Sequence, residues 1–311
     1  MKKNLLFRGA ATALVTPFSD GKIDYPAFGA LIDMQMHSGI AALVVCGTTG
    51  EASALTEEEH ASLVSFAKER VQGRLPVIAG CGSPSTKHAE MLIRDACSAG
   101  ADAVLVVTPY YNKCSQEGLY RHFITLADAS RVPLLLYEVP ARTGVRMEPD
   151  TCQRLSQHEN IAGIKDATGD AEHASAGLDL CGDALPLYSG CDGLTVPLLS
   201  LGAQGVISVL SNFAPAAVSA LCSLWFSGDT AAAGLLQCRL SPVIRALFSE
   251  VSPIPVKTVM AESGICREEF RLPLCPLSKE KRELLFSRIR KVLPETVLFS
   301  DAAADSFFKE Y

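Results

Sequence analysis

Eight short apolar runs, separated by longer amphipathic segments, constrain the fold of this chain more than any other feature. The runs are rich in Val, Leu and Ile and show little polar alternation, which is typical of strands buried on both faces of a parallel sheet. They lie at residues 11–15, 41–45, 77–79, 103–107, 134–137, 161–165, 187–189 and 205–209. Eight strands with helices between them predict an α/β fold, a (β/α)8 barrel of the TIM type. A doubly wound open sheet is the main alternative, but it usually has about five or six strands.

Helical patterns fill the segments between the runs. Thr56 and Glu59 form a capping box that begins one helix, and residues 85–99 and 115–130 carry similar patterns. After the eighth run only helical patterns remain, over 231–245, 255–263 and 279–292. We therefore predict a barrel over residues 1–228 and a C-terminal helical domain with a tail over 229–311. The polar, alanine-rich residues 299–311 are expected to be loosely ordered.

Composition and charge exclude several classes of protein. Hydrophobic residues make up 48% of the 311 residues, ample for a buried core, but no stretch reaches the roughly 18 apolar residues of a membrane span. The first residues hold too short an apolar stretch for a secretory signal, so we expect a soluble, cytoplasmic protein. The net charge of −6 is spread over the chain without a basic run, so nucleic acid is not an expected partner.

Eleven cysteines are scattered along the chain, and no pair has CxxC spacing. The six histidines do not flank them in metal-ligand patterns, so we predict neither a metal site nor a cofactor. Most of the cysteines are expected to be small buried apolar residues in a reducing compartment. Cys46 and Cys191 lie beside the motifs described next, and nothing in the sequence requires them to react.

Lys165 stands at the end of the sixth run, where a barrel of this type places its active residues. Strand alternation puts Ile161, Gly163 and Lys165 on one face, with Gly163 leaving space below the lysine. If that face is the barrel interior, burial favours the neutral amine, which is the nucleophile that a Schiff base requires. The alternative is an ordinary lysine at a strand end that extends to solvent.

Three further strand ends carry polar side chains. After the second run, residues 47–51 (Gly-Thr-Thr-Gly-Glu) can bring backbone N–H groups and the hydroxyls of Thr48 and Thr49 to one point, which suits a small carboxylate. The fourth and fifth runs end near Tyr111 and Tyr137, with Arg142 close by. A phenol can pass protons and an arginine fork suits a carboxylate. The alternative for residues 47–51 is an ordinary strand-to-helix turn, and the alternative for the tyrosines is packing in the wall of the barrel. The turn after the third run lacks the third glycine of a dinucleotide fingerprint.

In this order the motifs resemble those of the dihydrodipicolinate synthase and N-acetylneuraminate lyase superfamily, over nearly the whole chain. They are Gly-Thr-Thr-Gly-Glu, Pro-Tyr-Tyr-Asn, Tyr-x-x-Pro-x-Arg-Thr-Gly and Gly-Ile-Lys-Asp, followed by Ser189-Gly190, Gly205-Val206-Ile207-Ser208, Pro255-Val256-Lys257 and Arg271-Leu272-Pro273-Leu274. The resemblance implies that Lys165 forms an imine with pyruvate. Thr48 and Thr49 would hold the pyruvate carboxylate, largely through backbone N–H groups.

The resemblance also implies the proton chemistry of the site. Tyr137 would act as the acid and base at the imine, and Tyr137, Thr49 and Tyr111 would form a proton relay. Tyr111 would come from the neighbouring subunit, so the smallest complete unit would be a dimer, and a homotetramer built as a dimer of dimers is expected. The carbonyl groups of Gly190 and Ile207 would line the site near the lysine.

The resemblance implies that a second pocket decides the substrate, and Arg142 is the informative residue there. In the synthase an arginine at this place binds the carboxylate of L-aspartate 4-semialdehyde, which favours condensation of that aldehyde with pyruvate to 4-hydroxy-tetrahydrodipicolinate, for lysine and diaminopimelate biosynthesis. Glu138 departs from the usual asparagine after the catalytic tyrosine. Its carboxylate would either pair with Arg142 and weaken the binding of substrate by this arginine, or hold the loop rigid.

Positions of the lysine feedback site of regulated synthases also differ. Matching positions carry Ala52, His60, Pro84 and His88, with Tyr110 kept. Loss of the glutamate removes the partner of the effector's ammonium group. We therefore predict weak or absent inhibition by lysine, and a micromolar inhibition constant would contradict this.

Two other functions stay open at this point. One is another class I pyruvate aldolase, such as a 2-keto-3-deoxy sugar acid aldolase or N-acetylneuraminate lyase. The other is a catalytically silent barrel that serves as a binding protein. Borohydride trapping with pyruvate separates the enzymes from the silent barrel.

Overall fold

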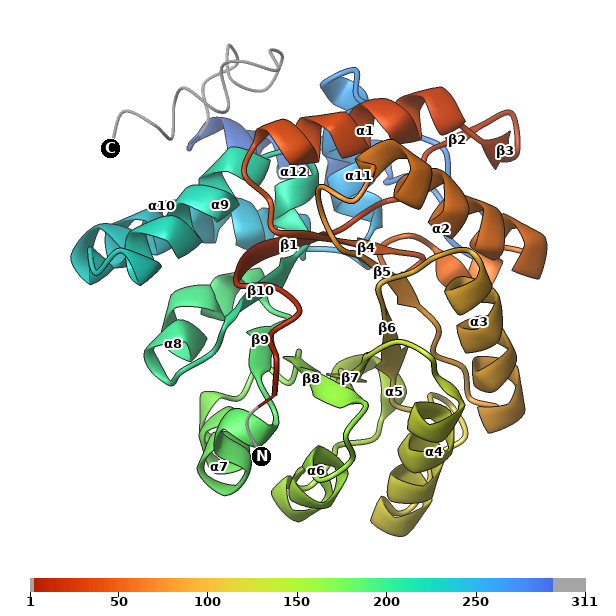
Figure 1. The fold of residues 1–311 in the computed structure, drawn as a ribbon. Helices are drawn as coiled ribbons and strands as arrows, with labels where there is room; N and C mark the ends of the chain where they lie inside the picture. Colours follow the sequence, from red (N-terminus) through yellow and green to blue (C-terminus); the bar gives the residue numbers. More distant parts are fainter. Residues whose placement is uncertain (1–2, 293–311) are drawn as a thin grey trace.

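Eight parallel strands close into a barrel in the computed structural model, which describes residues 3–292 (Figure 1). The order around the barrel is β1-β10-β9-β8-β7-β6-β5-β4, and β4 pairs with β1. The strands are Gly9–Ala13 (β1), Ala42–Val45 (β4), Val77–Gly80 (β5), Ala103–Val107 (β6), Leu134–Glu138 (β7), Ile161–Asp166 (β8), Leu187–Ser189 (β9) and Gly205–Ser208 (β10). The predicted barrel is therefore confirmed, and each strand overlaps one predicted run.

An outer ring of helices covers the strands (Figure 1). The capping box predicted for α2 is present, because the Thr56 hydroxyl accepts from the Glu59 N–H at 3.2 Å and the Glu59 carboxylate accepts from the Thr56 N–H at 3.0 Å. The longer helices of the ring are Tyr25–His37 (α1), Glu57–Val71 (α2), Thr86–Ser98 (α3), Gln116–Ala129 (α4), Pro149–Ser156 (α6), Ala171–Cys181 (α7) and Pro215–Phe226 (α9). The short helices Pro140–Thr143 (α5) and Thr195–Ser200 (α8) follow β7 and β9.

Two apolar layers hold the barrel together. A small inner layer fills the barrel interior with side chains such as Ile78, Leu105 and Ile207. A larger outer layer packs the strands against the helices. Both faces of each strand are thus buried, which explains why the runs show no polar alternation.

The predicted alternation of β8 is wrong at its first residue. Ile161 pairs with Leu134, but Gly163 pairs with Leu135, so the register shifts by one residue between them. As a result Ile161 packs in the outer layer together with Ile164. The inserted residue restores the inward direction at Gly163 and Lys165. A Cβ atom at Gly163 would lie 2.5 Å from the Pro186 carbonyl oxygen, so glycine permits close approach of β9 there.

Three helices follow the barrel: Thr230–Leu247 (α10), Ile254–Glu262 (α11) and Lys279–Arg290 (α12). They match the three predicted segments, and α10 packs on α9 and α12. Side chains of α10 and α11, including Leu240 and Val256, belong to the same outer apolar layer as the barrel. The boundary at residue 228 stays a prediction, because the two parts share this layer. Residues 299–311 lie outside the described residues.

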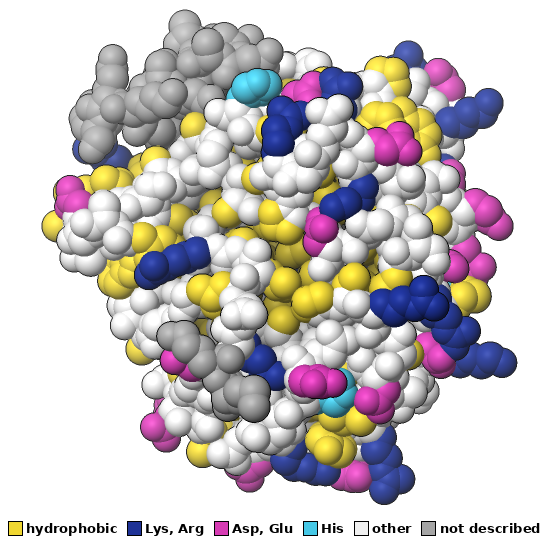
Figure 2. All heavy atoms as spheres, in the orientation of Figure 1, with side chains coloured by type: hydrophobic (Ala, Val, Ile, Leu, Met, Phe, Trp, Pro, Cys, Tyr) yellow, Lys and Arg dark blue, Asp and Glu magenta, His cyan; other side chains and the backbone are white. Residues whose placement is uncertain are grey.

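A two-stranded hairpin, Phe18–Ser19 (β2) and Lys22–Ile23 (β3), follows β1. Asp20 and Gly21, both with positive φ, form its turn. In residues 3–292, no helix is long and apolar enough to cross a bilayer. Basic and acidic side chains lie among one another on the face drawn in Figure 2, around a central apolar region.

Candidate active site

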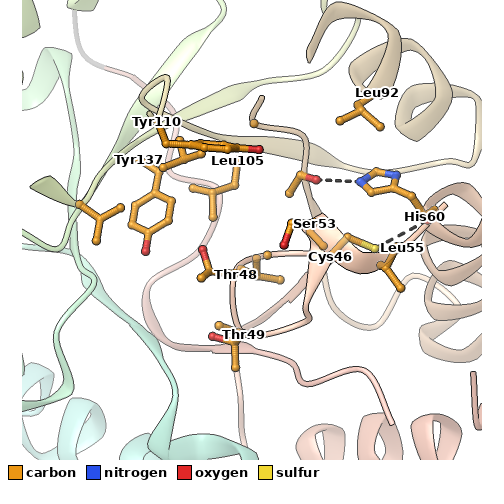
Figure 3. A pocket seen from close by; sticks show the side chains of 18 of the residues that line it. Cys46, Thr48, Thr49, Ser53, Leu55, His60, Leu92, Leu105, Tyr110 and Tyr137 are labelled. Carbon is orange, nitrogen blue, oxygen red and sulfur yellow. Dashed lines mark hydrogen bonds between the residues drawn. The ribbon is translucent and has the colours of Figure 1, made fainter. Parts of the chain in front are cut away.

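A cavity of about 660 Å³ opens beside the carboxyl ends of β4, β7 and β8. Five of the eight predicted site residues line it: Thr48, Thr49, Tyr137, Arg142 and Lys165. Figure 3 shows the Tyr137 hydroxyl pointing toward Thr48, with Thr49 next along the same loop. The strand ends therefore bring these side chains to one cavity, as expected for a barrel of this type.

Lys165 lies in the barrel interior, beside Tyr137 on β7 and Tyr188 on β9. Its side chain is only 6% exposed. Burial lowers the pKa of Lys165 to about 8, while Cys191 and Asp192 partly oppose this effect and nearby Arg142 adds to it. At pH 7 roughly one amine in ten is therefore neutral, against roughly one in three thousand at the ordinary value of 10.5. The geometry thus favours a nucleophilic lysine over one that extends to solvent.

Tyr137 lies against the lysine, with its ring centroid 4.3 Å from Lys165 Nζ. Burial raises the pKa of the Tyr137 phenol, while the charge of Arg142 and a hydrogen bond with the Thr48 side chain lower it in part. The phenol is consequently protonated at neutral pH and can donate a proton next to the amine.

The loop of residues 46–51 carries Thr48 and Thr49 and is called the threonine loop below. It begins and ends with strained residues. Cys46 and Glu51 have φ values of 56° and 55°, in the left-handed region that non-glycine residues seldom adopt. Between them, the Gly50 N–H donates to the Gly47 carbonyl at 3.0 Å. Thr49 is buried and Thr48 is exposed to the cavity. A tight turn of this kind can bring successive backbone N–H groups to one point, so the predicted carboxylate site stays a prediction.

Arg142 belongs to α5 and lines the cavity. Its Nη2 donates to the Ser252 carbonyl at 3.0 Å, which positions the guanidinium from the C-terminal part of the chain. Glu138 does not pair with Arg142. Its carboxylate faces the opposite side of β7, where it accepts from the Met147 N–H at 2.8 Å and lies 3.3 Å from His173 Nε2. Of the two expected roles for Glu138, these contacts favour the one that holds the following loop.

Gly190 lies near the lysine, and neither Gly190 nor Ile207 is among the residues that line the cavity. A Cβ atom at Gly190 would be 3.1 Å from Lys165 Cε and 2.9 Å from the Asp166 carbonyl oxygen, so only glycine fits beside the lysine. Ile207 pairs with Ala11 and lies in the inner apolar layer. Gly190 is therefore a neighbour of Lys165. That the carbonyl groups of Gly190 and Ile207 line the site stays a prediction.

Tyr111 is not brought to the cavity by this chain. Its side chain is 96% exposed and its φ is 64°. Within one chain the predicted relay from Tyr137 through Thr49 therefore stops before Tyr111. The predicted contribution of Tyr111 to a neighbouring subunit stays a prediction.

The same cavity is lined by four of the five positions compared with the lysine feedback site: Ala52, His60, His88 and Tyr110. The His60 Nε2–H donates to the Gly80 carbonyl at 2.7 Å, at the far side of Figure 3 from Tyr137. Burial lowers the pKa of His60, so the ring is neutral at pH 7. His88 lies 3.3 Å from the Glu57 carboxylate. The prediction of weak lysine inhibition is not tested by these contacts.

Two buried charged groups next to the site were not assigned from the sequence. Asp192 accepts from the N–H groups of Val209 and Leu210 at 3.0 and 3.1 Å, and burial raises its pKa. Lys257 of α11 lies 2.6 Å from Glu51 of the threonine loop. Lys257 stands in one of the quoted motifs, but no pattern in the sequence pairs it with a residue so far away.

All eleven cysteines are free thiols. Five are buried: Cys46, Cys81, Cys152, Cys181 and Cys222. Burial raises the pKa of the Cys191 thiol beside Lys165 to about 11, so it is protonated at neutral pH. The buried thiols behave as apolar packing groups, as expected. Four other cysteines are only partly buried, and Cys238 and Cys275 are exposed, so the expectation that most of the set is buried is wrong.

Comparison with known proteins gives one consistent result. The model of the family described as "Dihydrodipicolinate synthetase family" matches residues 6–292. A 4-hydroxy-tetrahydrodipicolinate synthase of Geobacter sulfurreducens is 48% identical over 90% of this chain and 97% of its own. The crystal structure of dihydrodipicolinate synthase from Thermotoga maritima has a TM-score of 0.90 at 40% identity, covering 92% of this chain and 99% of that one. A monomeric dihydrodipicolinate synthase variant also has a TM-score of 0.90 at 40% identity, covering 93% and 98%.

Proposed function

Because the chain belongs to the dihydrodipicolinate synthetase family, we propose that it condenses pyruvate with L-aspartate 4-semialdehyde, the 4-hydroxy-tetrahydrodipicolinate synthase reaction of lysine and diaminopimelate biosynthesis. The chain is an enzyme of the lyase class. The observation that carries the proposal is a buried lysine with a pKa of about 8 that shares one cavity with Thr48, Thr49, Tyr137 and Arg142.

Lys165 is the proposed nucleophile. Its neutral amine attacks the ketone carbon of pyruvate, and loss of water gives an imine with the lysine. Removal of a proton from the pyruvate methyl group then gives the enamine, whose carbon attacks the aldehyde. The amino group of the aldehyde substrate next attacks the imine carbon, which closes the ring and releases Lys165. These steps need protons moved beside the lysine, and Tyr137 is the protonated group in contact with it.

Thr48 and Thr49 are the proposed binding groups for the pyruvate carboxylate. The carboxylate would receive hydrogen bonds from the backbone of the tight turn, beside the amine that attacks the adjacent carbon. Gly190 and Ile207 are proposed to contribute carbonyl groups on the side of the barrel next to the lysine. Such fixed dipoles orient the ketone without reorganisation during the reaction.

Arg142 is the proposed binding group for the carboxylate of the aldehyde substrate. It lies on the cavity wall and is oriented by the Ser252 carbonyl. Since the Glu138 carboxylate faces His173 and Met147, it does not compete for the guanidinium. This arrangement supports a carboxylate-bearing aldehyde as the second substrate.

Assembly completes the proposal. Tyr111, exposed on the surface of one chain, would enter the site of a second copy and extend the relay from Tyr137 through Thr49. We propose a homotetramer made of two such dimers. The similar monomeric variant indicates that this fold alone does not require assembly. A cytoplasmic enzyme with small-molecule substrates, and without nucleic-acid or membrane partners, fits the function.

Borohydride trapping tests the function directly. Reduction in the presence of pyruvate should add the mass of the reduced pyruvate imine at Lys165, and the absence of an adduct would leave a silent binding barrel. A coupled assay then compares pyruvate plus aspartate semialdehyde with cleavage of sugar acids. Turnover of sugar acids alone would assign the chain to another pyruvate aldolase, such as N-acetylneuraminate lyase.

A further inference from the structure

A fully buried ion pair lies directly behind the threonine loop. Lys257 of α11 is 0% exposed, and its Nζ lies 2.6 Å from Glu51 Oε1. The two residues are 206 positions apart in the sequence. Neither is among the residues proposed to contact substrate, so the pair has no role in the reaction as described so far.

Every proton of the Lys257 ammonium has an acceptor. Besides Glu51, the ammonium donates to the Thr16 carbonyl at 3.0 Å and to the Glu269 carbonyl at 2.6 Å. The second oxygen of Glu51 accepts from the Arg271 N–H at 3.2 Å. These contacts fix both side chains in one geometry, which satisfies the condition under which a buried ion pair is tolerated.

The ion pair of Lys257 with Glu51 holds the threonine loop at its strained end. Glu51 holds a left-handed backbone conformation and follows Thr48 by three residues and Thr49 by two. The Thr16 hydroxyl donates to the Gly50 carbonyl at 2.7 Å, while the Thr16 carbonyl accepts from Lys257. The ammonium therefore holds Glu51 directly and Gly50 through Thr16. A strained backbone persists only where such surroundings determine it.

Arg271, which follows α11 in the chain, also holds the residues that follow the threonine loop. The Arg271 guanidinium donates to the Glu59 carboxylate at 2.5 and 2.6 Å and to the Ala54 carbonyl at 2.9 Å. Residues 51–59 are thus held from the C-terminal part of the chain at both ends. Through-space contacts of this kind couple α11 and the following segment to the loop.

We propose that Lys257 and Glu51 are positioning residues for the pyruvate carboxylate: the buried pair holds the backbone of the threonine loop in the conformation that receives it. The proposal rests on the proposed function. It makes the C-terminal helices part of the pyruvate site, although none of their described residues lines the cavity. The pair then sets the affinity for pyruvate rather than the chemistry at Lys165.

The test uses the full-length double variant Lys257→Met/Glu51→Gln, which removes both charges and leaves an amide able to accept from the Arg271 N–H. We expect the KM for pyruvate to rise about tenfold, because displacement of a binding loop by a fraction of an ångström is enough for such a loss. The kcat at saturating pyruvate should stay within about threefold and the KM for the aldehyde within about twofold, the pattern of lost ground-state binding.

Lys281→Met is the matched control. It removes another lysine–glutamate pair of the C-terminal helices, that of Lys281 with Glu250, which lies on the surface. All three constants should stay within about twofold of the wild type. If the double variant does not fold, Glu51→Asp, which keeps both charges but shortens the reach, should raise the KM for pyruvate in the same direction.

An unchanged KM for pyruvate in the folded variant, or a fall in kcat alone, would overturn the positioning role and leave the pair a purely structural one. This outcome is distinct from failure of the proposed function. The latter appears in the wild type, as the absence of a borohydride adduct at Lys165 with pyruvate. An adduct in the wild type together with an unchanged KM in the variant would reject only the positioning role.

Discussion

Two lysines are buried among residues 3–292, and their surroundings differ in one decisive respect. Lys257 has a carboxylate at 2.6 Å and carbonyl acceptors for its other protons. Lys165 has no ion-pair partner among the described acidic residues, and it faces an open cavity instead. Burial lowers the pKa of both lysines. For Lys257 a hydrogen-bonded carboxylate opposes this effect, whereas for Lys165 the opposing charge of Asp192 acts without an ion pair.

This difference separates a structural lysine from a reactive one. A buried ammonium with complete hydrogen bonding stays charged and is of no use as a nucleophile. A buried amine without them is easily deprotonated, and the cost of its burial lowers the stability of the folded chain. The barrel therefore tolerates a destabilising lysine, Lys165, where an imine is to form. It keeps a lysine with complete hydrogen bonding, Lys257, where a loop is to be held.

Lys165→Met gives the largest expected effect. Without the amine no imine forms, so activity should fall by at least about 10⁴-fold, as for loss of other covalent nucleophiles. The variant should form no borohydride adduct with pyruvate. The same change should raise the free energy of unfolding at pH 7 by roughly 3 kcal/mol, because a fall in the lysine pKa from 10.5 to about 8 has that energetic equivalent.

Steady-state assays and denaturant titration measure the two effects of Lys165→Met. Lys281→Met serves as the control at an exposed lysine and should change neither quantity. Residual activity within a hundredfold of the wild type would mean that another group carries the reaction.

Lys257→Met should have the opposite effect on stability. The change leaves the Glu51 carboxylate buried without its partner, which costs about 3–5 kcal/mol for pairs of this kind. Thermal unfolding at fixed protein concentration should therefore show a lower transition temperature for this variant and a higher one for Lys165→Met. Equal shifts in the same direction would remove the distinction between the two lysines.

Much of this arrangement could be predicted from sequence patterns, because the relevant signals are local. The eight apolar runs, the capping box at Thr56 and the residues that follow each strand are short-range features, and each has its place in the structure. The topology then brings Thr48, Tyr137, Arg142 and Lys165 together, since parallel strands end at the same rim.

Long-range and single-residue features escaped prediction for physical reasons. The pair of Lys257 with Glu51 joins segments with no common pattern, and the register shift in β8 inserts one residue into a strand too short to reveal it by periodicity. Two-residue strands such as β2 and β3 bury too little to leave a pattern. The site of Tyr111 depends on a second copy of the chain, which one sequence does not position.

Arg142→Met should affect the second substrate alone. Loss of a charge-assisted fork to a carboxylate costs roughly 1.5–3 kcal/mol, so the KM for aspartate semialdehyde should rise about 10- to 100-fold. Trapping of pyruvate at Lys165 should be retained, because the threonine loop is not changed.

Two controls accompany Arg142→Met. Arg146→Met removes a nearby arginine that pairs with Asp170 on the surface, and Glu138→Gln changes the carboxylate on the far side of β7. Arg146→Met lies on the surface and should leave the two KM values within about twofold. Glu138→Gln should do the same, because its amide oxygen can still accept from the Met147 N–H and hold the loop. A large effect of Glu138→Gln on the aldehyde KM would show that this carboxylate does influence Arg142.

The pH dependence of imine formation is the smallest effect and the most direct measure of the contrast between the lysines. Only the neutral amine of Lys165 attacks, so the rate of trapping at low pyruvate should rise roughly fivefold from pH 7 to pH 8 and level off above it. Between about pH 8 and 10.5 the unfolded chain holds a proton at this lysine that the folded chain lacks, so the wild type gains stability as the pH rises through this range. The stability advantage of Lys165→Met should shrink over the same interval. A trapping rate that keeps rising toward pH 10.5 would mean that Lys165 titrates as an ordinary exposed lysine, and burial would then not be the origin of its reactivity.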